Sequence, residues 1–226
     1  MLRFPGMDGT ALSFRPLTPA LLPDLARLFG PRGACAGCWC RWWKTTRAEF
    51  DARRGEGNRA ALFREVRGGA VPGILAYAGA EPVGWCAVEP RGAYPRLGRS
   101  RILAPVDDEP VWSVTCFYVA RPLRRRGLTS ELLAAAAAHA RRGGARLLEA
   151  YPVEPGRATA DSALYTGLAR TFLRLGFREV ARRSGTRPLL RLRLKGGRGP
   201  RARARARGRS RARSSPTRPS DGRRSR

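Results

Sequence analysis

The chain has 226 residues, 42% of them hydrophobic, which fits one folded domain with extensions. Its formal net charge is +28. No apolar run approaches the ~20 residues that span a bilayer, and the first residues lack the apolar stretch of a secretory signal. The five cysteines, an odd number, argue against a disulfide framework. We therefore expect a soluble cytoplasmic protein with no membrane partner.

The positive charge has two interpretations that the sequence leaves open. One is an anionic partner, such as nucleic acid or another phosphate-bearing molecule. The other is compositional bias, because Lys44 and Lys195 are the only lysines among 45 basic residues.

The first half of the chain predicts one strand, two helices and a hairpin. A short strand over 13–16 precedes a helix after Thr18, which ends at Gly30. A second helix is expected after Asn58 as its N-cap. Strands over 73–78 and 83–89 flank a turn, and residues 90–110 read as a loop.

The second half alternates strands and helices. The continuous apolar run 111–119 predicts a central strand buried on both faces. A helix over 127–142 follows, with small residues on its apolar stripe. We expect a strand over 145–153, a helix over 161–175 and two final strands over 177–183 and 186–194. This order predicts an α/β (α+β mixed) fold with a central mixed sheet flanked by helices.

The chain divides into three predicted regions. Residues 1–11 read as a flexible arm and residues 12–195 as one domain. Residues 196–226 hold 12 of the 45 basic residues and one of the 17 acidic ones. Arginine recurs there at every second position from Arg201 to Arg213, with nothing apolar to bury, so we expect a disordered tail.

The junction of the 111–119 strand with the next helix predicts an anion site. The strand runs into a turn with three adjacent arginines and Gly127, which opens directly into the helix. Such a turn presents unpaired backbone N–H groups at the positive end of the helix dipole. Gly127 allows a phosphate to approach the main chain. The turn lacks the G-x-x-x-x-G-K-[ST] pattern of a mononucleotide P-loop.

Residues 119–133 resemble the cofactor-binding motif of the GNAT superfamily of N-acetyltransferases, [Q/R]-x-x-G-x-[G/A]. Arg124, Gly127 and Thr129 occupy the patterned positions, with Thr replacing Gly or Ala. The Leu175-Gly176-Phe177 junction and the order of elements are also similar, so the likeness covers most of 12–195.

The resemblance implies an enzyme that moves an acetyl group from acetyl-CoA to an amine, by direct attack in a ternary complex. Backbone amides of the turn would hold the CoA diphosphate; these belong to Arg125, Arg126, Gly127, Leu128 and Thr129. Backbone groups of Phe117 and Val119 would pair with the pantetheine arm, and the Val119 amide would polarise the thioester carbonyl.

The catalytic groups are less clearly indicated. Many family members carry a tyrosine four residues before the Gly-Phe junction to protonate the leaving thiolate, but Phe172 stands there. Tyr165 is the candidate replacement, although the thiolate can also leave unaided. Glu89 and Glu154, each at the end of a predicted strand, are the candidate bases.

The segment Cys35 to Trp43 combines three cysteines and three tryptophans. Cys35, Cys38 and Cys40 have metal-like spacing, but a structural zinc site needs four ligands, and we predict no metal. One alternative is that Trp39, Trp42 and Trp43 form walls of the acceptor pocket; the other is that they are plain core residues.

Two other functions remain open. The domain can be a CoA-binding GNAT-fold module without turnover, a possibility that Phe172 raises. The arginine-rich tail can bind nucleic acid weakly and without sequence preference. The expected partners are acetyl-CoA and an unidentified amine, with the protein as a monomer or homodimer.

Overall fold

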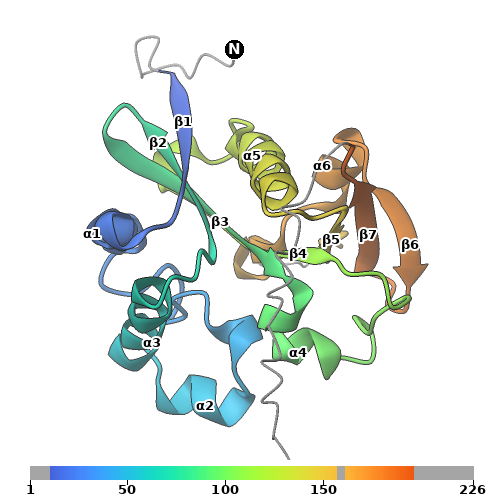
Figure 1. Ribbon diagram of the computed structural model, residues 1–226, viewed down its shortest axis with the longest axis horizontal. Helices are drawn as coiled ribbons and strands as arrows, with labels where there is room; N and C mark the ends of the chain where they lie inside the picture. Colours follow the sequence, from blue (N-terminus) through green and yellow to red (C-terminus); the bar gives the residue numbers. More distant parts are fainter. Residues whose placement is uncertain (1–10, 157–160, 196–226) are drawn as a thin grey trace, which may run out of the picture.

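The computed structural model describes residues 11–156 and 161–195, and its centre is a twisted sheet (Figure 1). The expectations for the N-terminal arm up to residue 10 and for the tail 196–226 lie outside the described residues. Seven strands of the described residues form the sheet, in the order β1-β2-β3-β4-β5-β7-β6. The strands are β1 (Leu12–Pro16), β2 (Gly73–Ala78), β3 (Glu81–Pro90), β4 (Trp112–Val119), β5 (Leu147–Ala150), β6 (Arg178–Arg182) and β7 (Pro188–Arg193).

The sheet is mixed, as predicted from the order of elements. Strands β4 and β5 run parallel, and every other neighbouring pair is antiparallel. Parallel strands need a crossover connection, and α5 supplies it between β4 and β5. The predicted fold class is therefore confirmed.

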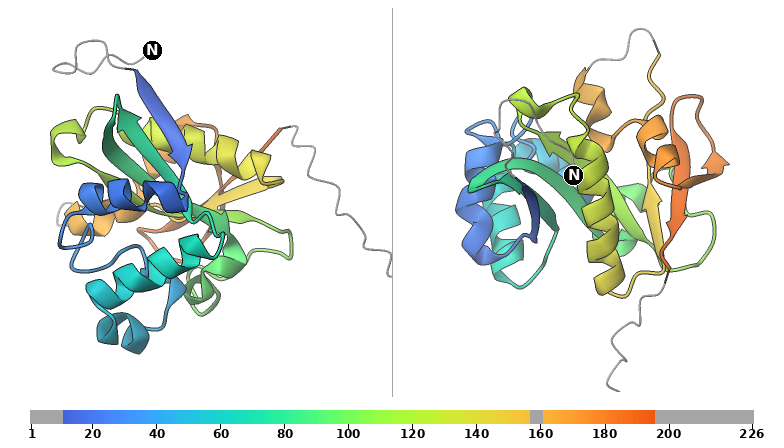
Figure 2. Two further views of the ribbon diagram at one scale, coloured as in Figure 1. Left: turned by 60° about the vertical axis from the view of Figure 1, so that its left-hand side comes forward. Right: turned by 90° about the horizontal axis from the view of Figure 1, so that it is seen from above.

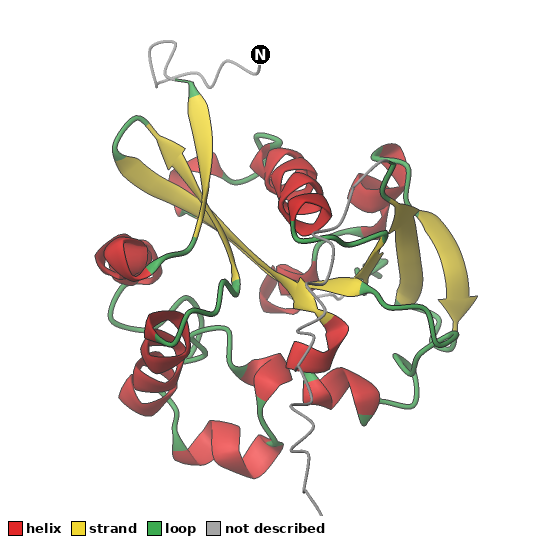
Figure 3. Ribbon diagram, in the orientation of Figure 1, coloured by secondary structure: helices red, strands yellow, loops and turns green. Residues whose placement is uncertain are grey.

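Helices cover both faces of this sheet (Figures 2 and 3). The α-helices are α1 (Leu22–Phe29), α2 (Arg47–Ala52), α3 (Glu56–Arg67), α4 (Pro95–Gly98), α5 (Leu128–Arg142) and α6 (Ala169–Arg174). Short 3₁₀ helices are η1 (Pro19–Leu21), η2 (Trp42–Lys44), η3 (Arg91–Ala93), η4 (Arg121–Leu123) and η5 (Asp161–Thr166). Helices α5 and α6 lie on one face, and the N-terminal helices lie on the other.

The face under α5 is the larger core. The buried stripe of α5 consists of Leu128, Leu132, Leu133, Ala136 and Ala140. Its small members let the helix lie close to the sheet, and Gly84 of β3 completes this close approach. A methyl group on Gly84 would stand 3.0 Å from the Leu132 Cδ1 atom.

The opposite face is covered by two clusters. Helices α1 and α3 pack over β2 and β3 around Trp85, which is fully buried. The segments η2 and α4 pack beside β7 and contribute Trp43, Tyr94 and Leu97, together with the fully buried Tyr151 that follows β5. The second cluster lies beside the centre of the sheet, where the candidate site forms.

Two predictions for the first half of the chain differ from the structure. Residues 90–110 contain η3 and α4 rather than a plain loop. Asn58 does not cap a helix, because α3 begins at Glu56 with Gly55 as its N-cap. The Asn58 side chain is fully buried and donates to the Gly37 carbonyl at 3.0 Å, so it ties α3 to the cysteine-rich segment.

The expected helix over 161–175 is broken into η5 and α6. Gly167 adopts a left-handed φ of 86° between them, a conformation that an α-helix excludes. After the break the Gly167 carbonyl accepts a hydrogen bond from Val153 N–H at 2.9 Å, and Ala169 N–H donates to the Val153 carbonyl. The expected strand over 145–153 is consequently shorter, because Val153 joins this separate bridge.

Replacing Gly167 by alanine should destabilise the fold. A Cβ atom there would meet the Phe172 ring at 2.7 Å, and the left-handed φ is strained for alanine. We expect the free energy of unfolding to fall by roughly 2–4 kcal/mol in urea denaturation. Gly156→Ala is the control, since a Cβ at Gly156 meets nothing within 4 Å. An equal loss in both variants would contradict the steric explanation.

Candidate active site

The turn between β4 and α5 has the backbone conformation of an anion cradle. Arg125 has φ 61° and Gly127 has φ 86°, so two left-handed residues lie just before the first turn of α5. Gly127 is the N-cap of α5 and makes no side-chain cap. Left-handed residues next to a helix N-terminus turn successive N–H groups toward one concave side.

Several amides of this turn are available to a ligand. Ser130 N–H bonds the Gly127 carbonyl at 2.9 Å, but no hydrogen bond within the described residues uses the N–H of Arg125, Gly127, Leu128 or Thr129. The helix dipole adds positive potential at this end. The turn can therefore hold a diphosphate through its main chain.

Strand β4 presents a free edge beside this turn. Its pairing with β5 covers residues 112–114 only, so among the described strands the β5 side of residues 115–119 has no partner. Ala120 N–H donates to the Val83 carbonyl of the other neighbour, β3. Because backbone groups alternate along a strand, Phe117 and Val119 turn their amides toward the free edge. An extended amide chain such as pantetheine can pair there as an added strand.

Arg124 fixes the end of this edge. Its Nε atom donates to the Val119 carbonyl at 3.1 Å, so the side chain links the strand to the turn that follows it. The Arg125 side chain is exposed, and the charge of the three arginines adds to the potential of the turn. Arg126 makes contacts of its own.

Tyr165 lies on η5, which packs against β4. Its ring stands 6.5 Å from the Trp43 ring, and burial raises the pKa of its hydroxyl well above the usual range. The phenol therefore stays protonated at neutral pH and can donate a proton. Phe172, the residue at the usual position of the acid, is fully buried between Phe117 and Phe177.

Glu89 lies near the end of β3 and is 7% exposed. Lys44 of η2 forms an ion pair with its Oε2 atom, and the Lys44 side chain is also 7% exposed. Burial raises the pKa of the Glu89 carboxyl, while the neighbouring Lys44 ammonium lowers it less strongly. A carboxylate with a raised pKa is a stronger base than an ordinary one.

Tyr165 and Glu89 both contact the short helix η2. Trp43 contacts the Tyr165 ring and its neighbour Lys44 contacts Glu89, so η2 joins the two predicted groups. The Trp43 indole N–H is buried and has no partner among the described residues, so a ligand in this region can accept its hydrogen.

Glu154 lies elsewhere and has a different environment. Its side chain is 44% exposed and forms a bidentate ion pair with Arg182 of β6, at 2.7 and 2.9 Å. Hydrogen bonds from Arg182 lower the pKa of the Glu154 carboxyl. No contact among the described residues joins Glu154 to Glu89 or Tyr165.

The tryptophans have separate surroundings. Trp39 is buried in the cluster under α1, 5.6 Å from the Phe29 ring. Trp42 packs on Phe50 at 5.2 Å, and the Arg96 guanidinium lies 3.8 Å over its ring. Of the three, Trp43 is the one whose ring contacts a predicted catalytic residue.

One cysteine of the segment Cys35 to Trp43 lies next to a cysteine of β4. The Cys40 and Cys116 sulfur atoms are 3.7 Å apart. Burial raises the pKa of the Cys38 thiol to about 12, so it stays protonated. Among residues 11–156 and 161–195, no group of three His, Cys, Asp or Glu side chains is placed to hold a metal ion.

Sequence reasoning missed Lys44 and Tyr94. Lys44 is one of two lysines in a chain rich in arginine, which was a signal for a position that needs a compact ammonium. Tyr94 precedes α4 and is 1% exposed, with the Lys44 ammonium 5.6 Å over its ring. Burial and the Glu89 charge raise its pKa well above the usual range. The sequence predicted a loop over 90–110, which gave no reason to single out Tyr94.

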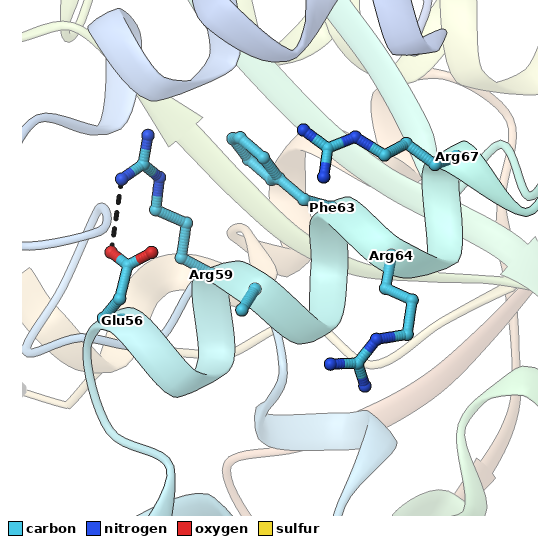
Figure 4. Close-up of a pocket in the computed structure, with 6 residues that line it drawn as sticks. Glu56, Arg59, Phe63, Arg64 and Arg67 are labelled. Carbon is cyan, nitrogen blue, oxygen red and sulfur yellow. Dashed lines mark hydrogen bonds and ion pairs between the residues drawn. The ribbon is translucent and has the colours of Figure 1, made fainter.

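A hollow of about 440 Å³ lies on the outer side of α3 (Figure 4). It is lined by Glu56, Arg59, Ala60, Phe63, Arg64 and Arg67. The Arg59 and Arg67 guanidinium groups lie 5.0 and 5.8 Å from the Phe63 ring centre. None of the predicted site residues lines it, so it is separate from the turn and from η2.

Comparison with known proteins finds similarity in both sequence and fold. Residues 39–168 match the acetyltransferase (GNAT) family. An acetyltransferase of the GNAT family from Listeria monocytogenes is 11% identical, with a TM-score of 0.50 over 81% of this chain and 95% of that one. An N-acetyltransferase from Staphylococcus aureus is 13% identical, with a TM-score of 0.48 over 82% and 99%. One from Thermoplasma acidophilum, in complex with coenzyme A, is 12% identical, with a TM-score of 0.47 over 81% and 99%.

Among the curated proteins none matches this sequence. The family match covers more than half of the chain, and the fold agrees with it. The chain belongs to the GNAT acetyltransferase family. In the part of the chain that the structure describes, each helix is too short or too polar to cross a membrane.

Proposed function

We propose that this protein transfers an acetyl group from acetyl-CoA to an amine, within a ternary complex. The observation that carries the proposal is the combination of free amides before α5 with the unpaired edge of β4. A diphosphate and a peptide-like arm are both present in CoA, and the two features lie side by side in the order that such a donor requires.

In this proposal the main chain binds the donor. Amides of Arg125, Arg126, Gly127, Leu128 and Thr129 hold the diphosphate. The backbone groups of Phe117 and Val119 pair with the pantetheine arm, and the Val119 amide polarises the thioester carbonyl. Arg124 keeps the edge and the turn in register through its bond to Val119.

The chemistry balances with two side chains. The amine nitrogen attacks the thioester carbonyl carbon and forms a C–N bond, and the carbon–sulfur bond then breaks. Glu89 takes up the proton that the amine loses. Tyr165 gives its proton to the CoA thiolate. We place Glu89 ahead of Glu154 as the base, because Arg182 holds the Glu154 carboxyl in a low-pKa ion pair.

The direct test is binding and turnover with the full chain. Isothermal titration calorimetry with acetyl-CoA should show one site, and release of free CoA thiol should depend on an added amine from a panel. Binding without release across the panel would favour a CoA-binding module without turnover. Absence of binding would contradict the proposal as a whole.

The pH dependence should identify the base. Glu89 acts only when deprotonated, and its raised pKa moves half-deprotonation above the ~4.3 of an ordinary glutamate. We expect kcat/KM to rise with pH through this raised value. Glu89→Gln should remove this limb, whereas Glu154→Gln should keep it. A limb that follows Glu154 instead would reverse the assignment.

We also propose that residues 12–195 are sufficient for this activity and that 196–226 are an accessory segment. A chain that ends at residue 195 should then bind acetyl-CoA as the full chain does. Salt-sensitive binding to nucleic acid, if the tail supplies it, should disappear with the truncation. Loss of acetyl-CoA binding on truncation would contradict this division.

A further inference from the structure

Four charged side chains form a continuous chain of ion pairs beside the candidate site. Arg41 contacts Glu65 of α3, Glu65 contacts Lys44 of η2, and Lys44 contacts Glu89 of β3. The series alternates in sign and connects three elements that are distant in the sequence. The Lys44 and Glu89 side chains are 7% and 9% exposed, whereas those of Arg41 and Glu65 are 13% and 25% exposed.

Lys44 is enclosed at the centre of this chain. Its ammonium lies between a Glu65 oxygen and a Glu89 oxygen, and the Tyr94 ring faces it at 5.6 Å. Lys44 is therefore shared between two carboxylates. A buried ammonium with two anionic partners stabilises both in the charged form, but each partner competes for it.

The charged and titratable groups around Glu89 come from every element packed on it. They are Lys44 from η2, Arg41 before η2, Glu65 from α3 and Tyr94 before α4. Tyr94 stays neutral because burial raises its pKa, so three charges act on Glu89: two positive and one negative. The two positive charges favour the carboxylate, and the negative charge of Glu65 opposes it.

We propose that Lys44 and Glu65 are positioning residues for the base Glu89: Lys44 holds its carboxylate charged and fixed, and Glu65 limits that effect. The inference rests on the proposed function of Glu89. Neither residue touches the reacting atoms in this scheme. Together they set the pH at which Glu89 changes from an acid to a base.

The size of the side chain matters at position 44. A lysine ammonium is a compact point charge that two oxygens from different elements can approach, whereas a guanidinium is planar and wider. Arginine supplies nearly all other basic residues of this chain, yet lysine stands here. Lys44→Arg should keep the charge but disturb the placement of Glu89.

The experiment measures the protonation of Glu89 directly. Protein with ¹³C-labelled glutamate is titrated by NMR, and Glu89→Gln assigns the signal. Lys44→Met should raise the pH of half-protonation of Glu89 by roughly one to two units, because its main cation is lost. Glu65→Gln should lower it by about half a unit, because the competing anion is lost.

The opposite signs distinguish this role from a structural one. Lys44→Met risks unfolding because it leaves the buried Glu89 carboxylate without its ion-pair partner, so Glu65→Gln and Lys44→Arg provide independent variants that keep the cation. Glu56→Gln is the matched control on the same helix, since this exposed carboxylate pairs with Arg59 at 3.2 Å. It should leave the Glu89 titration unchanged.

Two results of the titration would overturn the inference. One is an unmoved Glu89 titration in both Glu65→Gln and Lys44→Met; the other is a shift of the same sign in both. The titration needs no amine substrate, so its result does not depend on whether the protein turns over. If the acid limb of kcat/KM disappears in Glu89→Gln but does not move in Glu65→Gln, Glu89 remains the base and this inference alone fails.

Discussion

Tyr165→Phe should lower kcat by about 100-fold and leave the acetyl-CoA dissociation constant unchanged. General acids contribute ~10²–10⁴-fold when they protonate a leaving group. Phenylalanine keeps the ring contact with Trp43, so the change removes the hydroxyl with little loss of packing. Burial keeps the pKa of the Tyr165 hydroxyl above its usual range, so the effect should be the same throughout the neutral and mildly alkaline range.

The measurement is steady-state release of CoA thiol, with binding followed separately by calorimetry. Phe172→Tyr is the informative partner variant, because it restores a tyrosine at the position that other family members use. Phe172 is fully buried, with the Phe117 and Phe177 rings 6.0 and 5.2 Å away. A hydroxyl there should lower the free energy of unfolding by ~1–3 kcal/mol. When Phe172→Tyr is combined with Tyr165→Phe, kcat should stay low. An unchanged kcat in Tyr165→Phe would mean that the thiolate leaves unaided.

Gly127→Val should weaken acetyl-CoA binding by at least ~100-fold, about 2.7 kcal/mol. The φ of 86° is unfavourable for a β-branched residue, so the turn would change its shape. A side chain at the helix N-cap would also occupy the space through which the diphosphate approaches the amides. Both effects act on the cradle rather than on the core.

The control for this variant is Gly69→Val. Gly69 also has a left-handed φ, 95°, and a Cβ there meets nothing within 4 Å. It follows α3 at the other end of the sheet, so it imposes a similar backbone strain away from the cradle. Similar losses of affinity in both variants would attribute the effect to general destabilisation and contradict the cradle.

The cradle and the sheet were accessible from the sequence because their signals are local. The apolar run before three arginines and Gly127 predicts a strand, a turn and a helix within about 30 residues. Hydrophobic periodicity and a glycine before a helix both reflect the local backbone conformation. The left-handed φ of Gly127 is the conformation that such a turn needs.

The catalytic candidates were harder to rank, since their roles depend on what surrounds them. Glu89 and Glu154 look alike in the sequence, as acids that end strands. The structure buries Glu89 beside Lys44 and exposes Glu154 beside Arg182. The prediction of one helix over 161–175 was wrong for a related reason. Gly167 interrupts that helix where its carbonyl accepts a hydrogen bond from Val153.

The sequence by itself determined the class of fold and predicted the turn between β4 and α5, since both follow from backbone preferences over short stretches. The tertiary structure alone decided which side chains share an environment. Lys44, Glu65 and Glu89 come from three elements up to 45 positions apart, and they form one ion-pair chain only when α3 and η2 pack beside β3. Desolvation and charge pairing depend on distances across space, and a sequence pattern carries no record of them.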